Sequence, residues 1–413
     1  MDALREMVNH ADPTVHAQGV ELCLSLGSEA IGSVLSPLQA VEGWLISDHR
    51  AWTAARLSLL CETEQPLPAG ARRLCIAGVR GTDRLLPQLL ARVPGLEALD
   101  LSFTDVTDLT PLEAAPSLHA VHLQGCRAAP LDLSPLESLP SLADLCLSDA
   151  TLDWESLSTL RPARLWLDRL QLPEAWHLPD SVVSLSAEGA ALFDQPLDRL
   201  VRAGLRQLYL GDARDWHPED LAGGTLDALG LTFRAPLLGH NLPATRLSVR
   251  SDVWRNLRGL VSRFRRLENL VLHQEQSRFL GISDLGGPLV LDTVRVETPF
   301  ERGWPRGCTP SLGMFRFRRR TLQPGAAPSR DGAARWRAEG YRWSVLRGPM
   351  NSRQRLDLIK AVRRQANWGL RRSKDNTDPL YDETADAYPV AQALRLMGLW
   401  SHLGTACRLA PWE

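Results

Sequence analysis

One pattern of apolar and variable positions recurs along most of the chain. Six segments carry leucine at their first and sixth positions and leucine, or in one case valine, at the fourth: "LEALDL" from Leu96, "LHAVHL" from Leu118, "LADLCL" from Leu142, "LRQLYL" from Leu205, "LDALGL" from Leu226 and "LENLVL" from Leu267. Six weaker copies keep the same register: "ARRLCI" from Ala71, "PARLWL" from Pro162, "VVSLSA" from Val182, "ATRLSV" from Ala244, "LDTVRV" from Leu291 and "LGMFRF" from Leu312. The alternation that ends each copy predicts a short strand with one buried side.

The central apolar residues of the twelve copies follow one another in steps of 18 to 25 residues. They are Leu74, Leu99, Val121, Leu145, Leu165, Leu185, Leu208, Leu229, Leu247, Leu270, Val294 and Phe315. Over about Ala71 to Arg320 the chain resembles leucine-rich-repeat proteins, which implies an α/β solenoid whose stacked strands bury a shared interior. The asparagine that usually follows the strand is replaced in three repeats, by Thr104, Cys126 and Ala150.

The regions outside the repeats complete the predicted organisation. Before them, "DPTVHAQGVELCLSLG" and "SDHRAWTAARLSLLCE" combine a capping residue with helix-spaced apolar residues, so residues 1–66 are predicted to form a helical cap on the repeats of residues 67–320. A segment rich in proline, glycine and alanine is predicted to link them, over 321–340, to a small domain over 341–413. Its expected elements are strands over 342–346 and 405–410 and helices over 352–365, 370–377 and 384–397.

Within the small domain a motif stands out: "IKAVR" from Ile359, "NWGLR" from Asn367, and "SK" at Ser373 and Lys374. The order of elements and this motif resemble the C-terminal domain of the bacterial large-subunit ribosomal stalk protein, which recruits translational GTPases. The resemblance spans about residues 341–410 and implies a bacterial protein with a partner-binding face on this domain. Asn367 departs from the glycine of the family motif, and Trp368 and Trp400 add aromatic bulk, so the partner can differ where the fold is kept.

Lysine is restricted to this motif, because Lys360 and Lys374 are the only two lysines of the chain. Both fall on positions where the family carries lysine, although two lysines can also coincide with the motif by chance. The binding face that the resemblance implies consists of Leu356, Ile359, Lys360, Arg363, Arg371 and Lys374. Helical spacing predicts that Leu358 and Val362 face the core of the domain instead.

Charge divides the chain unequally, although its net charge is only −1 over 413 residues. Residues 316–413 carry 19 basic and 9 acidic residues, against 28 and 39 before them, so the tail is about +10 and the body about −11. A basic tail favours an acidic or nucleic-acid partner, and "RFRRR" from Arg316 is the candidate phosphate-binding segment. Alternatively, the charges of the tail and the body can neutralise each other.

The seven cysteines are widely spaced and form no C-x-x-C pair, and the chain shows no signal-peptide pattern. Both observations predict a cytoplasmic protein.

A column of side chains is predicted on the concave face of the solenoid, formed by the residue between the last two apolar positions of each strand. The column is Cys75, Asp100, His122, Cys146, Trp166, Ser186, Tyr209, Gly230, Ser248, Val271, Arg295 and Arg316. Asp100, His122 and Cys146 are consecutive in it, and a carboxylate, an imidazole and a thiol in this order are the parts of a nucleophilic site. The sequence supplies no oxyanion hole, and no Walker loop or H-E-x-x-H motif accompanies the three residues.

The same column also suits protein recognition, because aromatic and arginine side chains dominate the energy of protein interfaces. The candidate contacts on the concave face are Trp166, Tyr209, Arg246, Arg250, Arg295 and Arg316. We therefore expect a non-enzymatic adaptor without cofactor or metal, which binds a protein or peptide on the repeats and a second protein on the C-terminal domain. Two alternatives stay open: a nucleic-acid or ribosome-associated protein that uses the basic tail, and a peptide-presenting component of an enzyme complex.

Overall fold

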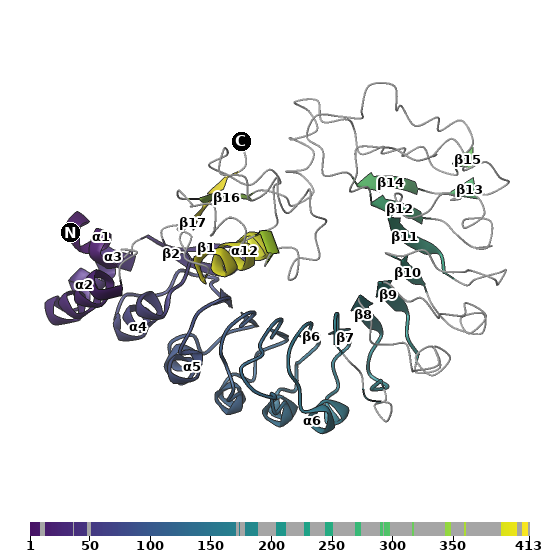
Figure 1. The fold of residues 1–413 in the computed structure, drawn as a ribbon, viewed down its shortest axis with the longest axis horizontal. Coiled ribbons are helices and arrows are strands. Elements are labelled where there is room, and N and C mark those ends of the chain that lie inside the picture. The colour runs from purple at the N-terminus through teal and green to yellow at the C-terminus, as the bar shows by residue number, and fades with distance from the viewer. Residues whose placement is uncertain are drawn as a thin grey trace. The chain divides into compact units, whose positions relative to one another are not determined.

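The computed structural model describes about half of the chain, most completely in the N-terminal half (Figure 1). The described residues are 1–8, 13–35, 37–47, 51–170, 173, 178–188, 204–211, 227–231, 244–250, 269–273, 290–291, 293–297, 316–317, 343–347, 359–360, 390–402 and 407–411. They belong to two compact units. The first unit joins residues 1–160 with residues 337–413, and the second consists of residues 161–336.

The N-terminal cap contains the expected helices and, in addition, a β-hairpin. The helices are α1 (Asp2–Val8), α2 (Pro13–Leu26), α3 (Ser28–Leu35) and α4 (Ala54–Glu62). Between α3 and α4, strands β1 (Leu38–Val41) and β2 (Trp44–Ser47) pair antiparallel. Their two-residue turn, Glu42–Gly43, has positive φ at both positions (50° and 85°), as a tight hairpin turn of type I′ requires. The sequence prediction of an all-helical cap was wrong at this hairpin.

Four repeats follow in the first unit, each with one short strand. The strands are β3 (Arg73–Cys75), β4 (Ala98–Asp100), β5 (Ala120–His122) and β6 (Asp144–Cys146), and β2 pairs parallel with β3. They alternate with helix α5 (Thr82–Arg92), the 3₁₀ helices η1 (Thr110–Ala114) and η2 (Ser134–Ser138), and helix α6 (Trp154–Thr159). The predicted central residues are direct ladder partners: Leu74 with Leu99, Leu99 with Val121, and Val121 with Leu145. The strand register predicted from the sequence is therefore confirmed in these repeats.

The second unit continues the pattern with seven parallel strands. They are β7 (Arg164–Trp166), β8 (Ser184–Glu188), β9 (Gln207–Gly211), β10 (Ala228–Leu231), β11 (Arg246–Arg250), β12 (Asn269–His273) and β14 (Thr293–Glu297). Their central residues also pair in sequence order, from Leu165 with Leu185 to Leu270 with Val294. The predicted register therefore holds among the four strands of the first unit and, separately, among these seven strands of the second unit.

The twelfth predicted strand departs from the expected ladder. Its residues form β15 (Arg316–Phe317), which pairs in parallel with β13 (Val290–Leu291), a strand located just before β14. The expectation that Arg316 follows Arg295 in one column was therefore wrong. "LVLDTVRV", from Leu289, offers two apolar stretches in a row, and both become strands.

A residue with a left-handed backbone follows each strand of the first repeats. These residues are Gly78, Phe103, Gly125, Asp149 and Arg169, with φ values of 77°, 62°, 71°, 62° and 61°. They stand at equivalent positions, because each lies two residues after the last apolar residue of its sequence repeat, which directly follows the strand. The left-handed residue turns the chain out of the sheet at the same point of each repeat. Only two of the five are glycine, the residue that adopts this conformation without steric cost.

The position of the usual asparagine is filled by small side chains that bond to the buried backbone. The hydroxyl of Thr104 donates to the carbonyl of Leu101 at 2.7 Å, and the thiol of Cys126 donates to the same carbonyl at 3.2 Å. Thr104 and Cys126 are also in mutual contact at 3.6 Å, and both are buried. A threonine and a cysteine of neighbouring repeats therefore satisfy a buried carbonyl in place of an asparagine ladder.

The C-terminal segment contributes three described elements to the first unit: β16 (Trp343–Arg347), α12 (Val390–His402) and β17 (Cys407–Pro411). Strands β16 and β17 pair antiparallel, and α12 lies against both of them and against β3 (Figure 1). The three elements overlap the predicted strand, helix and strand, while most of the other two predicted helices and the whole predicted linker lie outside the described residues. In the described part of the chain, no helix is both long enough and apolar enough to span a bilayer.

Candidate functional site

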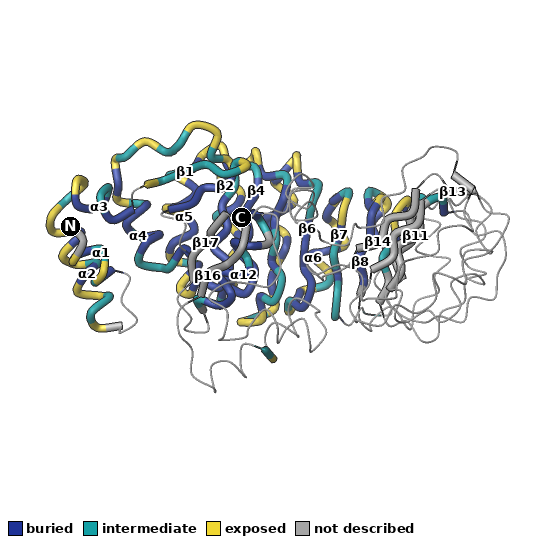
Figure 2. Tube along the Cα trace, turned by 90° about the horizontal axis from the view of Figure 1, so that it is seen from above, coloured by how far each residue is buried: buried dark blue, intermediate teal, exposed yellow. Residues whose placement is uncertain are grey.

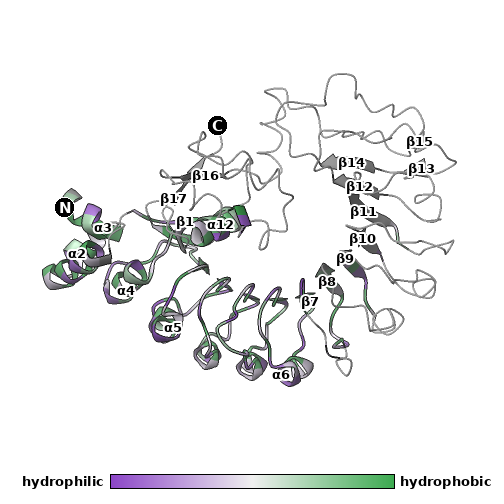
Figure 3. Ribbon diagram, in the orientation of Figure 1, coloured by the Kyte–Doolittle hydropathy of each residue, from purple (hydrophilic) through white to green (hydrophobic). Residues whose placement is uncertain are grey.

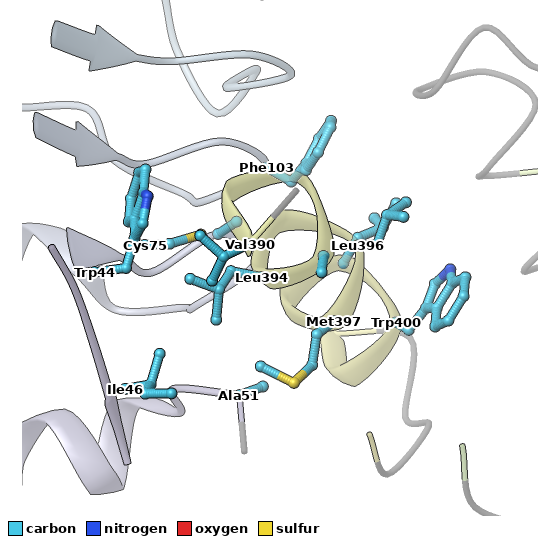
Figure 4. Close-up of a cluster of buried hydrophobic side chains, with 13 residues drawn as sticks. Trp44, Ile46, Ala51, Cys75, Phe103, Val390, Leu394, Leu396, Met397 and Trp400 are labelled. Carbon is cyan, nitrogen blue, oxygen red and sulfur yellow. The ribbon is translucent and has the colours of Figure 1, made fainter. Parts of the chain in front are cut away.

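The sheet face of the first unit, defined by Cys75, Asp100, His122 and Cys146, is covered by helix α12. The helix packs into a cluster with β2, with β3 and with the residues that follow β3 and β4 (Figure 4). This cluster consists of Trp44, Ile46, Ala51, Cys75, Ala77 and Phe103 from the N-terminal side and of Val390, Ala393, Leu394, Leu396, Met397, Leu399 and Trp400 from α12. The predicted column position Cys75 is therefore a core residue and is not open to a ligand.

Helix α12 is apolar on more than one side, as expected for a helix enclosed within a unit. Buried side chains follow it from Val390 to Trp400, and Figures 2 and 3 show that most of its length is both buried and hydrophobic. Gly398 permits the closest approach: a methyl group there would overlap with the backbone carbonyl of Ala77. The position of α12 is thus set by close packing against the chain that follows β3.

One charged side chain interrupts this apolar surface. The guanidinium of Arg395 donates through Nε to Oδ2 of Asp100 at 2.7 Å, and its NH2 group lies 2.5 Å from Nδ1 of His122. The Asp100 side chain is only 1% exposed, and its other oxygen accepts the backbone N–H of Ser102 at 3.0 Å. Burial alone would raise the pKa of the Asp100 carboxyl, but Arg395, His122 and Ser102 together outweigh it and hold this pKa below its ordinary value.

The imidazole of His122 is held neutral at this position. Burial, followed by the nearby guanidinium of Arg395, lowers the pKa of His122 to about 4, although Asp100 and Asp144 act in the opposite direction. Arginine carries only donors, so Nδ1 of His122 must be the acceptor in this contact. An Nδ1 that accepts from Arg395 carries no proton to donate to Asp100.

The structure brings the three candidate catalytic residues together but does not link them as a nucleophilic site needs. Asp100 pairs with His122 and His122 with Cys146 in the strand ladder. Arg395, however, takes both the carboxylate and the imidazole nitrogen that such a site uses to orient the base. The thiol of Cys146 lies 3.8 Å from the hydroxyl of Ser148. In this arrangement Asp100 and His122 act as ligands of a guanidinium.

The second unit presents the aromatic half of the predicted column. Trp166, Ser186 and Tyr209 are ladder partners on β7, β8 and β9, so the two aromatic residues stand two strands apart, about 9.6 Å, at one level of the sheet. Trp166 and Tyr209 are both partly exposed, and Ser186, which is buried, donates to the Asp168 carboxylate at 2.8 Å. The structure therefore places these two predicted contact residues on the same surface.

The remaining predicted contact residues are described only in part. Arg246 and Arg250 begin and end β11, and Arg295 is the ladder partner of Val271. On the C-terminal domain, Ile359 and Lys360 are helical, with Ile359 partly buried and Lys360 exposed. Leu356, Arg363, Arg371 and Lys374 lie outside the described residues.

Sequence reasoning missed the principal charged residue of the first unit. Arg395 was not singled out, because one arginine on an apolar helix resembles the many surface arginines of this chain. The available signal was its isolation: Arg395 is the only charged residue between Val390 and Trp400, and Asp100 is the only carboxylate in the predicted column. A single buried charge on each of two apolar surfaces predicts a pair between them.

Comparison with known proteins adds little to this description. No family model matches the chain, and no curated protein matches it. A solved structure with partial similarity is an internalin from Listeria monocytogenes, at 14% identity and a TM-score of 0.31, covering 71% of this chain and 96% of that chain. The repeat period and the parallel strand ladders within each unit define the fold class of the described residues as an α/β repeat solenoid.

Proposed function

We propose that the protein is a non-enzymatic adaptor that holds a protein or peptide on the sheet face of its repeats and a second protein on its C-terminal domain. The observation that carries the proposal is the packing of α12. In the first unit, the face that repeat proteins use for binding buries a helix of the same chain through apolar contacts and one guanidinium. This surface is thus chemically suited to protein segments.

The first binding surface of the proposal lies in the second unit. Trp166 and Tyr209 supply large aromatic surfaces at one level of the sheet, and such residues dominate the energy of protein interfaces. The basic strand residues Arg246, Arg250 and Arg295 favour a partner segment with acidic side chains. Catalysis by Asp100, His122 and Cys146 is disfavoured, because Arg395 occupies the two groups that would activate the thiol.

The second binding surface is the lysine-containing face of the C-terminal domain. Lys360 is exposed on a helix beside the partly buried Ile359, and the resemblance to the ribosomal stalk domain is what suggests a binding role for it. Lys374 carries the only other side-chain amine of the chain. A face of this kind favours an acidic protein partner, and the same charges leave a nucleic acid as the alternative outcome of the test.

The two surfaces can be separated by two double variants. Trp166→Ala with Tyr209→Ala removes the aromatic contacts, and Lys360→Glu with Lys374→Glu reverses the charge of the second face. We expect quantitative affinity purification from the native host to show that each variant loses more than tenfold of a different set of proteins. Folding should be nearly unchanged in the lysine variant, within about 0.5 kcal/mol, because Lys360 is exposed and the proposal places Lys374 on the same binding face.

The matched control is Val183→Ser, which changes an exposed apolar residue just before β8. It should retain every partner of the parent protein. Loss of the same proteins from both double variants, or retention of all of them, would refute the adaptor. If the partners lost only from the lysine variant are also lost after nuclease treatment, the second partner is a nucleic acid and not a protein.

A further inference from the structure

The contact between α12 and the sheet is apolar apart from one charged cluster, formed by Asp100, His122 and Arg395. Because the rest of the contact is apolar, this cluster can determine how α12 is oriented on the sheet. A buried ion pair adds little net stability relative to apolar residues of similar size, because both charges must leave water. It does penalise every arrangement that leaves either charge unpaired. Arg395 and Asp100 therefore fix which side of an apolar helix faces the sheet, while Leu394 and Met397 supply the packing.

His122 makes this charged cluster sensitive to protons. Its Nδ1 lone pair receives a hydrogen from Arg395, so the ring proton is on Nε2. The groups that act on the ring are Arg395 from α12, Asp100 from β4 and Asp144 from β6, and the thiols of Cys75 and Cys146 lie near the same guanidinium. One carboxylate thus already faces one guanidinium before the imidazole gains any charge.

We propose that Asp100, His122 and Arg395 form an acid-sensitive latch that holds α12 on the sheet face and releases it when His122 is protonated. The incoming proton binds the Nδ1 lone pair, so the N–H···N bond from Arg395 is broken. The imidazolium and the guanidinium then repel each other in a partly buried site, where Asp100 is the one carboxylate among the described residues that contacts the guanidinium. Detachment of α12 returns both cations to water.

The pH range of the latch follows from the two states of His122. With α12 attached, burial and Arg395 keep the pKa of His122 near 4, whereas a hydrated histidine has an ordinary pKa of about 6.5. The detached state therefore binds the proton more readily between these values. Attachment is fully favoured above about pH 6.5 and weakens as the pH falls towards 4, by roughly 10²-fold in total. Asp100, whose pKa is lowered, adds its own loss only at more acidic pH.

The experiment is hydrogen exchange of the full-length protein between pH 7.5 and 4.5, corrected for the intrinsic pH dependence of exchange. For peptides that cover α12 and β4, we expect the opening equilibrium of the parent to rise by up to tenfold per pH unit below about pH 6. His122→Asn keeps an acceptor for Arg395 but takes up no proton, so its opening equilibrium should stay nearly constant over the same range. His119→Asn, at the residue before β5, should retain the profile of the parent.

A second variant keeps the test decisive if His122→Asn does not fold at pH 7.5. Asp100→Asn combined with Arg395→Met removes the guanidinium that contributes, after burial, to the low pKa of His122, so the pH dependence of opening should be weaker than in the parent. The latch is wrong if the parent protein shows no pH dependence between 6.5 and 4.5. It is equally wrong if whichever of these two variants folds follows the same profile as the parent.

Discussion

At the scale of single residues, Phe103 combines an unfavourable backbone with favourable packing. A left-handed backbone costs a residue with a bulky side chain about 1–2 kcal/mol. The ring of Phe103 recovers this cost by its position, because it is buried between Gly125 of the next repeat and the cluster formed by α12. Phe103 therefore couples the turn of one repeat to the next repeat and to the C-terminal helix.

A series of three glycine-to-alanine changes separates strain from overlap. Gly95→Ala should be neutral or slightly stabilising, because a methyl group there has open space and an ordinary φ. Gly70→Ala should cost about 1 kcal/mol, since its φ is +83° but its surroundings are open. Gly125→Ala should cost roughly 2–4 kcal/mol, because its φ is +71° and the methyl would overlap with the Phe103 ring. Urea unfolding of the three variants measures the differences.

The decisive result is the order in which the three substitutions lower the free energy of unfolding. If Gly125→Ala is no worse than Gly70→Ala, then the Phe103 ring does not rest on Gly125. The sequence alone does not predict this contact, because the left-handed position is visible only where glycine occupies it, at Gly78 and Gly125. Phe103, Asp149 and Arg169 adopt it through the demands of the repeat stack, which override local preference.

At the scale of elements, two neighbouring repeats each supply a carboxylate that accepts hydrogen bonds from the other repeat at the start of α5. Asp105, after β4, accepts the backbone N–H groups of Gly81 at 2.9 Å and Thr82 at 3.2 Å, which are free donors at the helix N-terminus. In return, Asp83 of α5 accepts the N–H and hydroxyl of Thr107 at 2.9 and 2.6 Å. Each repeat therefore caps its neighbour, and the helix dipole favours both charges.

Asp105→Ala tests this exchange, and we expect it to lower the free energy of unfolding by about 1 kcal/mol at pH 7. Burial alone would raise the pKa of Asp105, but the N–H groups of Gly81 and Thr82 lower it below its ordinary value. The contribution is therefore present above pH 4 and should be lost as the pH falls further, so the parent and variant converge. Glu113→Ala, at an exposed position of η1, is the control. A difference that persists unchanged to pH 2 would show that the carboxylate charge is not responsible.

The elements divide clearly into those the sequence predicts and those it does not. Strand register was predictable within β3–β6, and within β7–β12 together with β14, because the apolar residue of each strand must face a shared interior, and a shift by one residue would expose it. The β1–β2 hairpin was missed because its turn is Glu-Gly, which lacks the usual asparagine or aspartate. Helix α12 was predicted from Thr384 to Met397, and its described part extends beyond this to His402, through Trp400 in the core.

At the scale of the whole molecule, the C-terminal segment belongs to the same compact unit as the first repeats. From sequence, residues 341–413 were expected to form a separate domain beyond a linker. The pairing of Arg395 with Asp100 joins residues 295 positions apart, and nothing local in either segment marks the other as its partner. The opposite charges of tail and body were visible in the sequence, and this ion pair is one described case in which they neutralise each other.

Cleavage within the predicted linker distinguishes a separable domain from an integral segment. A protease site inserted between Gly325 and Ala326 allows the purified chain to be cut, and we expect both fragments to remain together in size-exclusion chromatography at pH 7.5. The cluster around α12 buries seven of its side chains, which outweighs the entropy gained by dissociation. Leu394→Asp places an unpaired charge in this cluster and should release the C-terminal fragment after cleavage.

Ser401→Ala, at the partly exposed end of α12, serves as the matched control and should leave the fragments associated. Separation of the parent fragments at neutral pH would establish an independent C-terminal domain. Co-elution of the Leu394→Asp fragments would mean that α12 does not hold them together.

The burial of α12 also sets a schedule for biosynthesis. The ribosome makes Asp100 long before Arg395, and at about 5–20 residues per second the interval of 295 residues lasts roughly 15–60 s. During that time Trp44, Cys75 and Phe103 have emerged without the helix that covers them, so the nascent chain exposes an apolar surface to its surroundings. Chaperone demand should therefore be highest in the middle of translation, and codons that slow the ribosome between the two segments would prolong this period of exposure.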